Sequence, residues 1–350
     1  MSKEIKIANR PIGSGHSAYI IAEAGSNHNQ DFEMAKALIN AAAEAGADAI
    51  KFQAFMAKEH YSKHTPAFTY LKEQAYQQST YELIRSLEIN REWHAPLMEY
   101  AQSCGITFLS SPCDAEAIDQ LGHFGMAAFK VASFDLPDIH LIRRMAKYNK
   151  PIILSTGMAN YEDIEAALKA CYEEGNQDIV LLQCTSLYPA PVHLSNLSAI
   201  RTMKKAFGCP VGYSDHTFGD HIVLAAVALG ACMIEKHFTL DRKLPGPDHS
   251  FAVEPDGLSK MIQEIREIEQ AIGNGIKNGP HPEELEMYRK GRRSLHVRRG
   301  VKSGEIITVD NICVKRPGYG IAPHFLEKIA GLTVTKDIPE DHWISWEDFK

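Results

Sequence analysis

Short apolar runs alternate with amphipathic segments through the first 275 residues of the chain. The runs are continuous and rich in β-branched residues, which is typical of strands buried on both faces of a parallel sheet. Helical periodicity follows each run, as in 31–46 after the first. The eight predicted strands are 18–25, 49–53, 107–112, 128–133, 151–157, 179–186, 210–216 and 233–240.

Eight strand–helix units in succession predict an α/β protein built as a TIM (β/α)8 barrel. A doubly wound sheet is the alternative, but no GxGxxG turn follows the first strand to favour it. A polar insertion of roughly 54–80, which has no clear period, interrupts the second unit.

The pattern changes after residue 275, so we predict a barrel domain over 1–275. Residues 276–291 are polar and punctuated by Pro and Gly, as in a linker. Residues 292–350 carry short alternating runs and frequent turn residues, which predict a small, separate β-rich domain.

Composition narrows the possible partners. The net charge of −7 and the isoelectric point near 6.1 do not favour nucleic acid or an anionic membrane surface. The N-terminal segment has no apolar leader pattern, and the longest apolar run, 222–234, is too short to span a bilayer. The seven cysteines are scattered and form no CxxC pair, as expected of reduced cysteines in a cytoplasmic protein.

Each predicted strand ends in polar side chains. Functional residues of a TIM barrel lie at the carboxyl ends of its strands, so these side chains are expected to converge on one mouth. They are Glu23, Asn27, His28, Lys51, Gln53, Ser110, Ser111, Asp114, Lys130, Ser133, Asp135, Ser155, Thr156, Thr185, Ser186, Tyr188, Ser214, Asp215, His216, Glu235, Lys236 and His237.

Two lysines and several serines in this set suit a small phosphorylated anion. Lys51 and Lys130 supply positive charge, and hydroxyl groups supply hydrogen-bond donors. The serines concerned are Ser111, Ser133, Ser186 and Ser214. The alternative for Lys51 is a salt-bridged barrel lysine, and Glu23 could be its partner rather than a catalytic or substrate-binding residue.

His216 and His237 end neighbouring strands at matching depth and could share one divalent ion. Two neutral imidazoles favour Mn²⁺, Zn²⁺, Co²⁺ or Fe²⁺ over Mg²⁺. The alternative is that each histidine is a hydrogen-bonded structural residue. Strand alternation places Glu235 on the face of His237 and turns Lys236 toward the outer helices. Cys113 and Cys184 are interpreted as packing residues.

Seven motifs in order resemble the sialic acid synthase family over essentially the whole chain. They are "IIAEAGSNHN", "KFQ", "ILSTGM", "CTSLYPAP", "GYSDHTFG", "IEKHFTLDRKLPGPDHS" and "VKRPGYGI". That family includes N-acetylneuraminate, legionaminic acid and pseudaminic acid synthases and SpsE-type spore-coat polysaccharide proteins. The C-terminal segment resembles its antifreeze-like SAF domain, a β-clip-like fold.

The resemblance implies a carbon–carbon bond-forming transferase. Phosphoenolpyruvate would condense with the open-chain aldehyde of an N-acetylated amino sugar such as N-acetylmannosamine, releasing phosphate by C–O cleavage and giving a nine-carbon 2-keto sugar acid. Mn²⁺ is the expected ion at His216 and His237, with Co²⁺ or Mg²⁺ as alternatives. Glu23 would orient, or exchange a proton with, the reacting oxygen or water.

The resemblance also implies the binding residues. Phosphoenolpyruvate would be held by Lys51, Ser111, Lys130, Ser133, Ser186 and Ser214. The sugar would be held by Gln53, Asp135, Tyr188, Asp248 and Arg316. Arg316 would reach the barrel of a partner chain, which implies a domain-swapped homodimer.

The motif "ASFD" at 132–135 departs from the "GSGE" usual in sialic acid synthases and is nearer the "ASFE" of pseudaminic acid synthases. The motif "PGPDHS" instead resembles the neuraminate, legionaminate and SpsE branches. A 2,4-diacetamido-trideoxy hexose is therefore the alternative sugar. A metal-dependent aldolase acting without phosphoenolpyruvate and a non-catalytic polysaccharide-assembly subunit are the competing functions.

Overall fold

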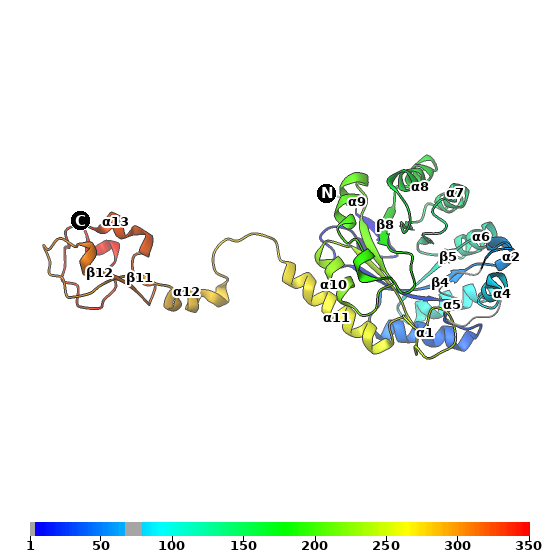
Figure 1. Ribbon diagram of the computed structural model, residues 1–350, viewed down its shortest axis with the longest axis horizontal. Coiled ribbons are helices and arrows are strands. Elements are labelled where there is room, and N and C mark those ends of the chain that lie inside the picture. The colour runs from blue at the N-terminus through cyan, green and yellow to red at the C-terminus, as the bar shows by residue number, and fades with distance from the viewer. Residues whose placement is uncertain (1–3, 67–78) are drawn as a thin grey trace. The chain divides into compact units, whose positions relative to one another are not determined.

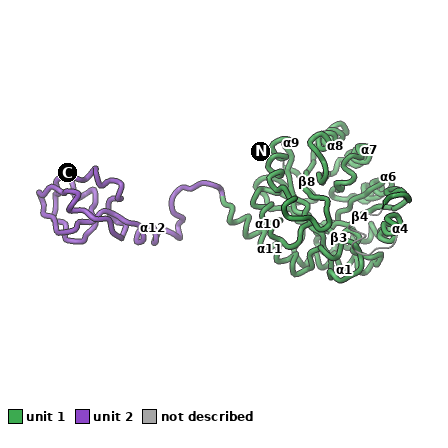
Figure 2. The backbone as a smooth tube through the Cα atoms, in the orientation of Figure 1, with its two compact units in different colours: residues 1–273 green, residues 274–350 purple. Residues whose placement is uncertain are grey.

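The computed structural model describes residues 4–66 and 79–350. The chain divides into two compact units, residues 1–273 and 274–350 (Figure 2). Within the described residues, no helix is both long enough and apolar enough to cross a bilayer.

The first unit contains a closed barrel of eight parallel strands, which confirms the predicted fold (Figure 1). Their order around the barrel is β10-β3-β4-β5-β6-β7-β8-β9. The strands are β3 (Tyr19–Gly25), β4 (Ala49–Ala54), β5 (Thr107–Pro112), β6 (Phe129–Val131), β7 (Ile152–Ser155), β8 (Ile179–Cys184), β9 (Val211–Asp215) and β10 (Met233–His237).

Helices surround the barrel (Figure 1). The principal ones are α1 (Phe32–Glu44), α5 (His94–Ser103), α6 (Ala115–His123), α7 (Ile139–Ala146), α8 (Tyr161–Glu173), α9 (Ala199–Phe207), α10 (His221–Ala228) and α11 (Pro255–Ile272). Short 3-10 helices occupy Arg91–Trp93 and Val192–Leu194. Side chains cap the amino ends of several helices. The Asp31 carboxylate accepts hydrogen bonds from backbone N–H groups in the first turn of α1, and the Asp114 carboxylate accepts one in the first turn of α6.

The polar insertion predicted at roughly 54–80 is partly helical. It contains α2 (Ala57–His60), and α4 (Thr80–Arg85) begins at its end. Residues 67–78 of the insertion lie outside the described residues. An apolar cluster of Phe55, Leu83 and Leu87 packs residues after the insertion against Phe55, which directly follows β4.

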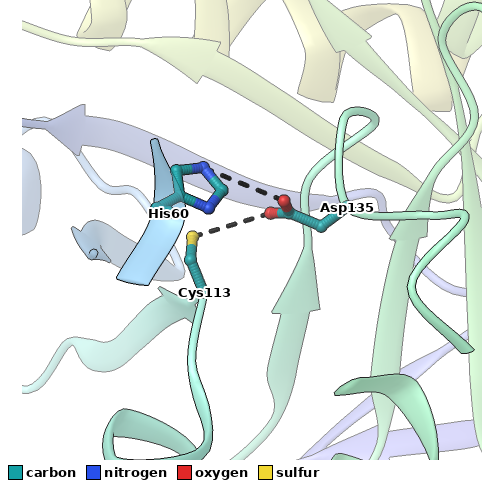
Figure 3. A group of neighbouring side chains, drawn as sticks. All are labelled: His60, Cys113 and Asp135. Atoms are coloured by element: carbon teal, nitrogen blue, oxygen red, sulfur yellow. Dashed lines mark hydrogen bonds and ion pairs between the residues drawn. The ribbon is translucent and has the colours of Figure 1, made fainter. Parts of the chain in front are cut away.

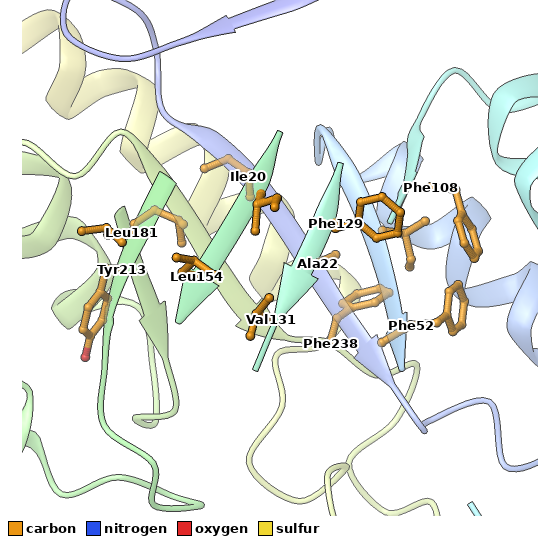
Figure 4. Close-up of a cluster of buried hydrophobic side chains, with 14 of the residues drawn as sticks. Ile20, Ala22, Phe52, Phe108, Phe129, Val131, Leu154, Leu181, Tyr213 and Phe238 are labelled. Carbon is orange, nitrogen blue, oxygen red and sulfur yellow. The ribbon is translucent and has the colours of Figure 1, made fainter. Parts of the chain in front are cut away.

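Outward-facing strand residues and the inner faces of the helices form the main core. Ile20, Phe52, Phe129, Leu154 and Phe238 are fully or almost fully buried in it (Figure 4). This burial of both sheet faces explains why the strands are continuous apolar runs rather than alternating ones.

An N-terminal hairpin closes one end of the barrel. Strands β1 (Ile5–Ile7) and β2 (Arg10–Ile12) pair antiparallel. Their Ile5, Ile7 and Ile12 pack with inward-facing residues near the amino ends of the barrel strands, such as Ile21 and Met233. The sequence analysis did not predict this hairpin. With that end filled by apolar side chains, the polar strand ends face the opposite mouth.

The second unit is small and carries little regular structure. Strands β11 (Ser294–Val297) and β12 (Ile312–Lys315) pair antiparallel. The helical segments are 3-10 turns at Pro282–Glu284, Val309–Asn311, Pro323–Phe325 and Trp346–Asp348, and helices α12 (Leu285–Gly291) and α13 (Leu326–Ile329). Its apolar core, which includes Leu295, Val297 and Ile344, confirms a small β-containing domain.

Lys236 faces away from the barrel interior, as strand alternation predicted. Its Nζ lies 2.5 Å from Asp215 Oδ2 and donates to the Thr217 carbonyl at 2.9 Å. Both charged residues are at most 3 % exposed. A buried charge of this kind is tolerated only while its partner remains.

Replacing Asp215 with Asn should therefore lower the free energy of unfolding by roughly 3–5 kcal/mol, because the Lys236 ammonium stays buried without a counter-charge. Urea unfolding followed by circular dichroism would measure the loss. The matched control is the double variant Asp215→Asn/Lys236→Met, which removes both charges and should recover most of the stability. A double variant as unstable as the single one would contradict the pairing argument.

Candidate active site

The carboxyl ends of the barrel strands surround one pocket. Twelve of the fourteen predicted site residues line it, from seven strands and the loops that follow them. They are Glu23, Lys51, Gln53, Ser111, Lys130, Ser133, Asp135, Tyr188, Ser214, His216, His237 and Asp248. Ser186 lies beside Ser133, since a Cβ on Gly157 would collide with both hydroxyls. Arg316 belongs to the second unit, where its Nε donates to the Gly291 carbonyl at 2.6 Å.

Four buried charges form a network at the base of the pocket. Lys51 Nζ lies 2.5 Å from Glu23 Oε2 and 3.6 Å from Glu235 Oε2. Lys130 Nζ lies 3.4 Å from Glu235 Oε1. All four residues are at most 5 % exposed. Because two cations face two anions, the network holds strong local fields without net charge.

The two glutamates of this network differ in acidity. Burial alone would raise the pKa of Glu235, but the charges of Lys130 and Lys51 lower that pKa to about 2. Burial raises the pKa of Glu23, and Lys51 only partly offsets the effect. Two carboxyls whose pKa values are pushed apart can take different roles, one as a fixed anion and the other as a proton carrier.

Asp248 lies near Glu23. Burial raises the pKa of Asp248 to about 6, and the charge of Glu23 adds to the effect. Gln53 Nε2 donates to Glu23 Oε1 at 2.9 Å and orients that carboxyl. The pocket therefore contains two carboxyl groups with raised pKa values, which suits them to exchange protons.

Serine hydroxyls lie beside these charged groups. Ser133 Oγ accepts a bond from the Gly157 N–H at 3.0 Å, and Ser214 Oγ donates to Glu235 Oε1 at 2.9 Å. Ser155 Oγ and Ser186 Oγ are buried and find no hydrogen-bond partner among the described residues. Buried hydroxyls without partners are costly, so these two are suited to bind the oxygens of a ligand.

The two strand-end imidazoles lie together, with ring centroids 5.3 Å apart. His216 Nδ1 donates to the Thr185 carbonyl at 2.7 Å, which leaves Nε2 as the nitrogen that can coordinate an ion. His237 Nδ1 is buried and has no hydrogen-bond partner among the described residues. Burial lowers the pKa of His237 well below its ordinary value, which keeps the imidazole neutral. These features fit a pair of metal ligands.

Sequence reasoning missed several residues of the pocket. Glu235 was placed on the correct face but not among the candidate site residues, and Ser155 was named only as a strand-end residue. Cys113 and Cys184 line the pocket although they were interpreted as packing residues. His60 comes from the insertion, where the absence of a period left no signal.

Known families and proteins are similar to this chain along most of its length. The NeuB family model matches residues 38–277, and the SAF domain model matches residues 292–350. The chain is 45 % identical over 328 residues to the N,N'-diacetyllegionaminic acid synthase of Campylobacter jejuni, covering 93 % of this chain and 98 % of that protein. It is 39 % identical over 362 residues to the spore coat polysaccharide biosynthesis protein SpsE of Bacillus subtilis, covering 98 % and 96 %.

A solved structure has a similar fold. The N-acetylneuraminic acid synthetase of Leptospira borgpetersenii superposes with a TM-score of 0.74 at 37 % identity, covering 82 % of this chain and 95 % of that one. Family models together cover most of the chain, and relatives above 30 % identity extend along nearly all of it. The protein therefore belongs to the NeuB family of sialic acid-type synthases and carries a C-terminal SAF domain.

Proposed function

We propose that this protein condenses phosphoenolpyruvate with the open-chain aldehyde of an N-acetylated amino sugar. The observation that carries the proposal is one pocket combining two buried lysines, serine hydroxyls that have no partner among the described residues and two adjacent imidazoles. The methylene carbon of phosphoenolpyruvate forms a bond to the aldehyde carbon, and the aldehyde oxygen takes a proton. Water adds to C2, the C2–O bond to phosphate breaks, and a nine-carbon 2-keto acid and inorganic phosphate result.

Phosphoenolpyruvate would lie against the lysines and serines. Lys51 and Lys130 face its negative charges, and Ser155 joins the hydroxyl donors predicted from the sequence, which are Ser111, Ser133, Ser186 and Ser214. Glu235 remains ionised and keeps both ammonium groups in place. An anion bound in this way is held by geometry and hydrogen bonds, because the network itself is neutral.

Glu23 would exchange the proton that the reaction requires. Burial raises the pKa of this carboxyl and so favours its protonated form, and an incoming anion would raise that pKa further. Gln53 fixes its orientation. The proton can then pass to the oxygen that develops negative charge when the carbon–carbon bond forms.

His216 and His237 would hold a divalent ion, for which Mn²⁺ is our proposal, with Co²⁺ and Mg²⁺ as alternatives. The chemistry that such an ion supplies is polarisation of a carbonyl oxygen. The Thr185 carbonyl presents His216 in the tautomer that can coordinate. Asp248 Oδ2, 3.7 Å from His237 Nδ1, stands where it can orient that ring or contact the sugar.

The sugar would lie toward Gln53, Asp135, Tyr188 and Asp248. N-acetylmannosamine is the first candidate. A 2,4-diacetamido-trideoxy hexose is the alternative, since Phe55, Ile84 and Leu87 give one wall of the pocket an apolar surface suited to methyl groups. The 45 % identity to a legionaminic acid synthase also favours it.

We further propose a cytoplasmic, domain-swapped homodimer. Apolar side chains are exposed on the loops around the mouth, namely Phe134, Met158, Leu187 and Phe218. Exposed apolar groups gathered in this way favour a covering partner. The SAF domain of a second copy would cover them and bring Arg316 to the sugar. The seven free cysteines are consistent with a reducing compartment.

The purified protein with Mn²⁺ and phosphoenolpyruvate should release inorganic phosphate only when an acceptable 2-acetamido sugar is added. The sugars to compare are N-acetylmannosamine and the 2,4-diacetamido hexoses of the mannose and altrose types. The variants His237→Ala and Lys51→Met should be inactive, the latter retaining its fold by circular dichroism. Absence of sugar-dependent phosphate with every sugar would overturn the synthase, and pyruvate formed without phosphate would identify an aldolase.

Mixing two damaged chains would test the domain swap. Glu23→Gln should inactivate its own barrel, and Arg316→Ala should raise the KM for the sugar. In a swapped heterodimer one site combines an intact barrel with an intact Arg316, so activity at low sugar concentration should rise after the chains are unfolded and refolded together. Refolding each variant alone gives the baseline, and Arg299→Ala, an exposed arginine of the same domain, is the control. No gain on mixing would contradict the swap.

A further inference from the structure

Three potential metal ligands meet on the wall of the pocket. His60 ends α2, Cys113 follows β5 and Asp135 follows β6. His60 Nε2 lies 3.9 Å from Asp135 Oδ1, and Cys113 Sγ lies 3.6 Å from Asp135 Oδ2. All three donor atoms lie within 4.8 Å of one another. Figure 3 shows the imidazole and the thiol facing the same carboxylate.

These separations suit a tetrahedral ion. Zinc binds sulfur at about 2.3 Å and nitrogen or oxygen at about 2.0–2.2 Å, which places tetrahedral ligands about 3.3–3.8 Å apart. The separations of 3.6 and 3.9 Å end on the two different oxygens of Asp135, and the three donor atoms lie within 4.8 Å of one another, so an ion would draw the side chains closer together. A thiol, an imidazole and a carboxylate form a ligand set that favours Zn²⁺ or Co²⁺ over Mg²⁺.

The cluster stands apart from the histidine pair. His60, Cys113 and Asp135 come from the ends of β4, β5 and β6 or the segments that follow them. His216 follows β9 and His237 ends β10, and these two strands are at least two strands away around the barrel in either direction. Their imidazoles are not part of the group of donor atoms within 4.8 Å. An ion held by one set therefore does not use the ligands of the other.

We propose that His60, Cys113 and Asp135 bind a thiophilic divalent cation of the Zn²⁺ class, with its fourth position open to the pocket. All three residues line the pocket, so that position can be taken by water or by an oxygen of a ligand. Burial, reinforced by Asp135, raises the pKa of the Cys113 thiol well above its ordinary value. Binding must therefore release the thiol proton, as it does at other cysteine sites.

The ion would inhibit catalysis, a consequence that rests on the proposed function. Asp135 is among the residues proposed to hold the sugar, and a bound cation would withdraw its carboxylate. Zn²⁺ should then compete with the sugar rather than with phosphoenolpyruvate. Loss of Cys113 should remove this competition. Binding of the ion can be measured independently of catalytic activity.

Cobalt provides the direct measurement. The full chain, freed of metal and titrated with Co²⁺, should bind two ions and develop a thiolate-to-cobalt absorption band in the near ultraviolet. Cys113→Ser should lose the band and one ion, and its Zn²⁺ affinity at this site should fall at least about tenfold, the size that even an outer-shell change causes. His60→Ala should lower the affinity as well, which provides a second variant if one of them fails to fold.

Two control variants test whether the absorption band comes from Cys113. Cys184 Sγ lies 3.9 Å from His216 Nδ1 and could bind an ion held by the histidine pair, so the band must survive in Cys184→Ser. It must also survive in His216→Ala/His237→Ala, which separates this proposal from the synthase activity. A band lost in Cys184→Ser, or a wild-type chain that binds one ion without a band, would overturn the proposal.

Discussion

The ion network of Glu23, Lys51, Lys130 and Glu235 is the constraint on which the rest of the site depends. Four charges can be buried together only when each faces an opposite charge at short range, because the pairing must offset the loss of hydration. The hairpin fills the other end of the barrel with apolar side chains, so the charged groups have no solvent on that side. The positions of these four side chains are therefore fixed by one another.

Successive polar residues of β10 point to opposite faces of the sheet. Glu235 and His237 point inward to the pocket, whereas Lys236 between them pairs with Asp215 behind the sheet. One short strand thus contributes both to chemistry and to the stability of the barrel wall. Its three successive polar residues, unusual in a buried strand, are explained by their alternate directions.

The sequence predicted the repeating elements of the barrel and missed several parts of it that do not repeat. Eight apolar runs with helices between them identify the barrel, and strand ends identify most of the pocket, because both follow from periodicity and topology. The hairpin with Ile5 and Ile12 has no such repeat, and its role depends on packing across the barrel. His60 lies in an aperiodic insertion, so only the folded chain shows that it meets Asp135.

The residues on the two sides of the pocket mouth come from different kinds of segment: strand ends on one side and long loops on the other. Ser214 and the imidazole of His216 are fixed by hydrogen bonds to neighbouring strand residues, so a change there disturbs the barrel. On the other side, His60 and the apolar Leu87 come from the long connection after β4, and Asp135 lies in the loop after β6. Such loops can change without altering the ion network. The departure "ASFD" falls on that side, next to residues that periodicity could not predict. Selection among N-acyl sugars is therefore expected to depend on the part of the pocket that the strand pattern specifies least.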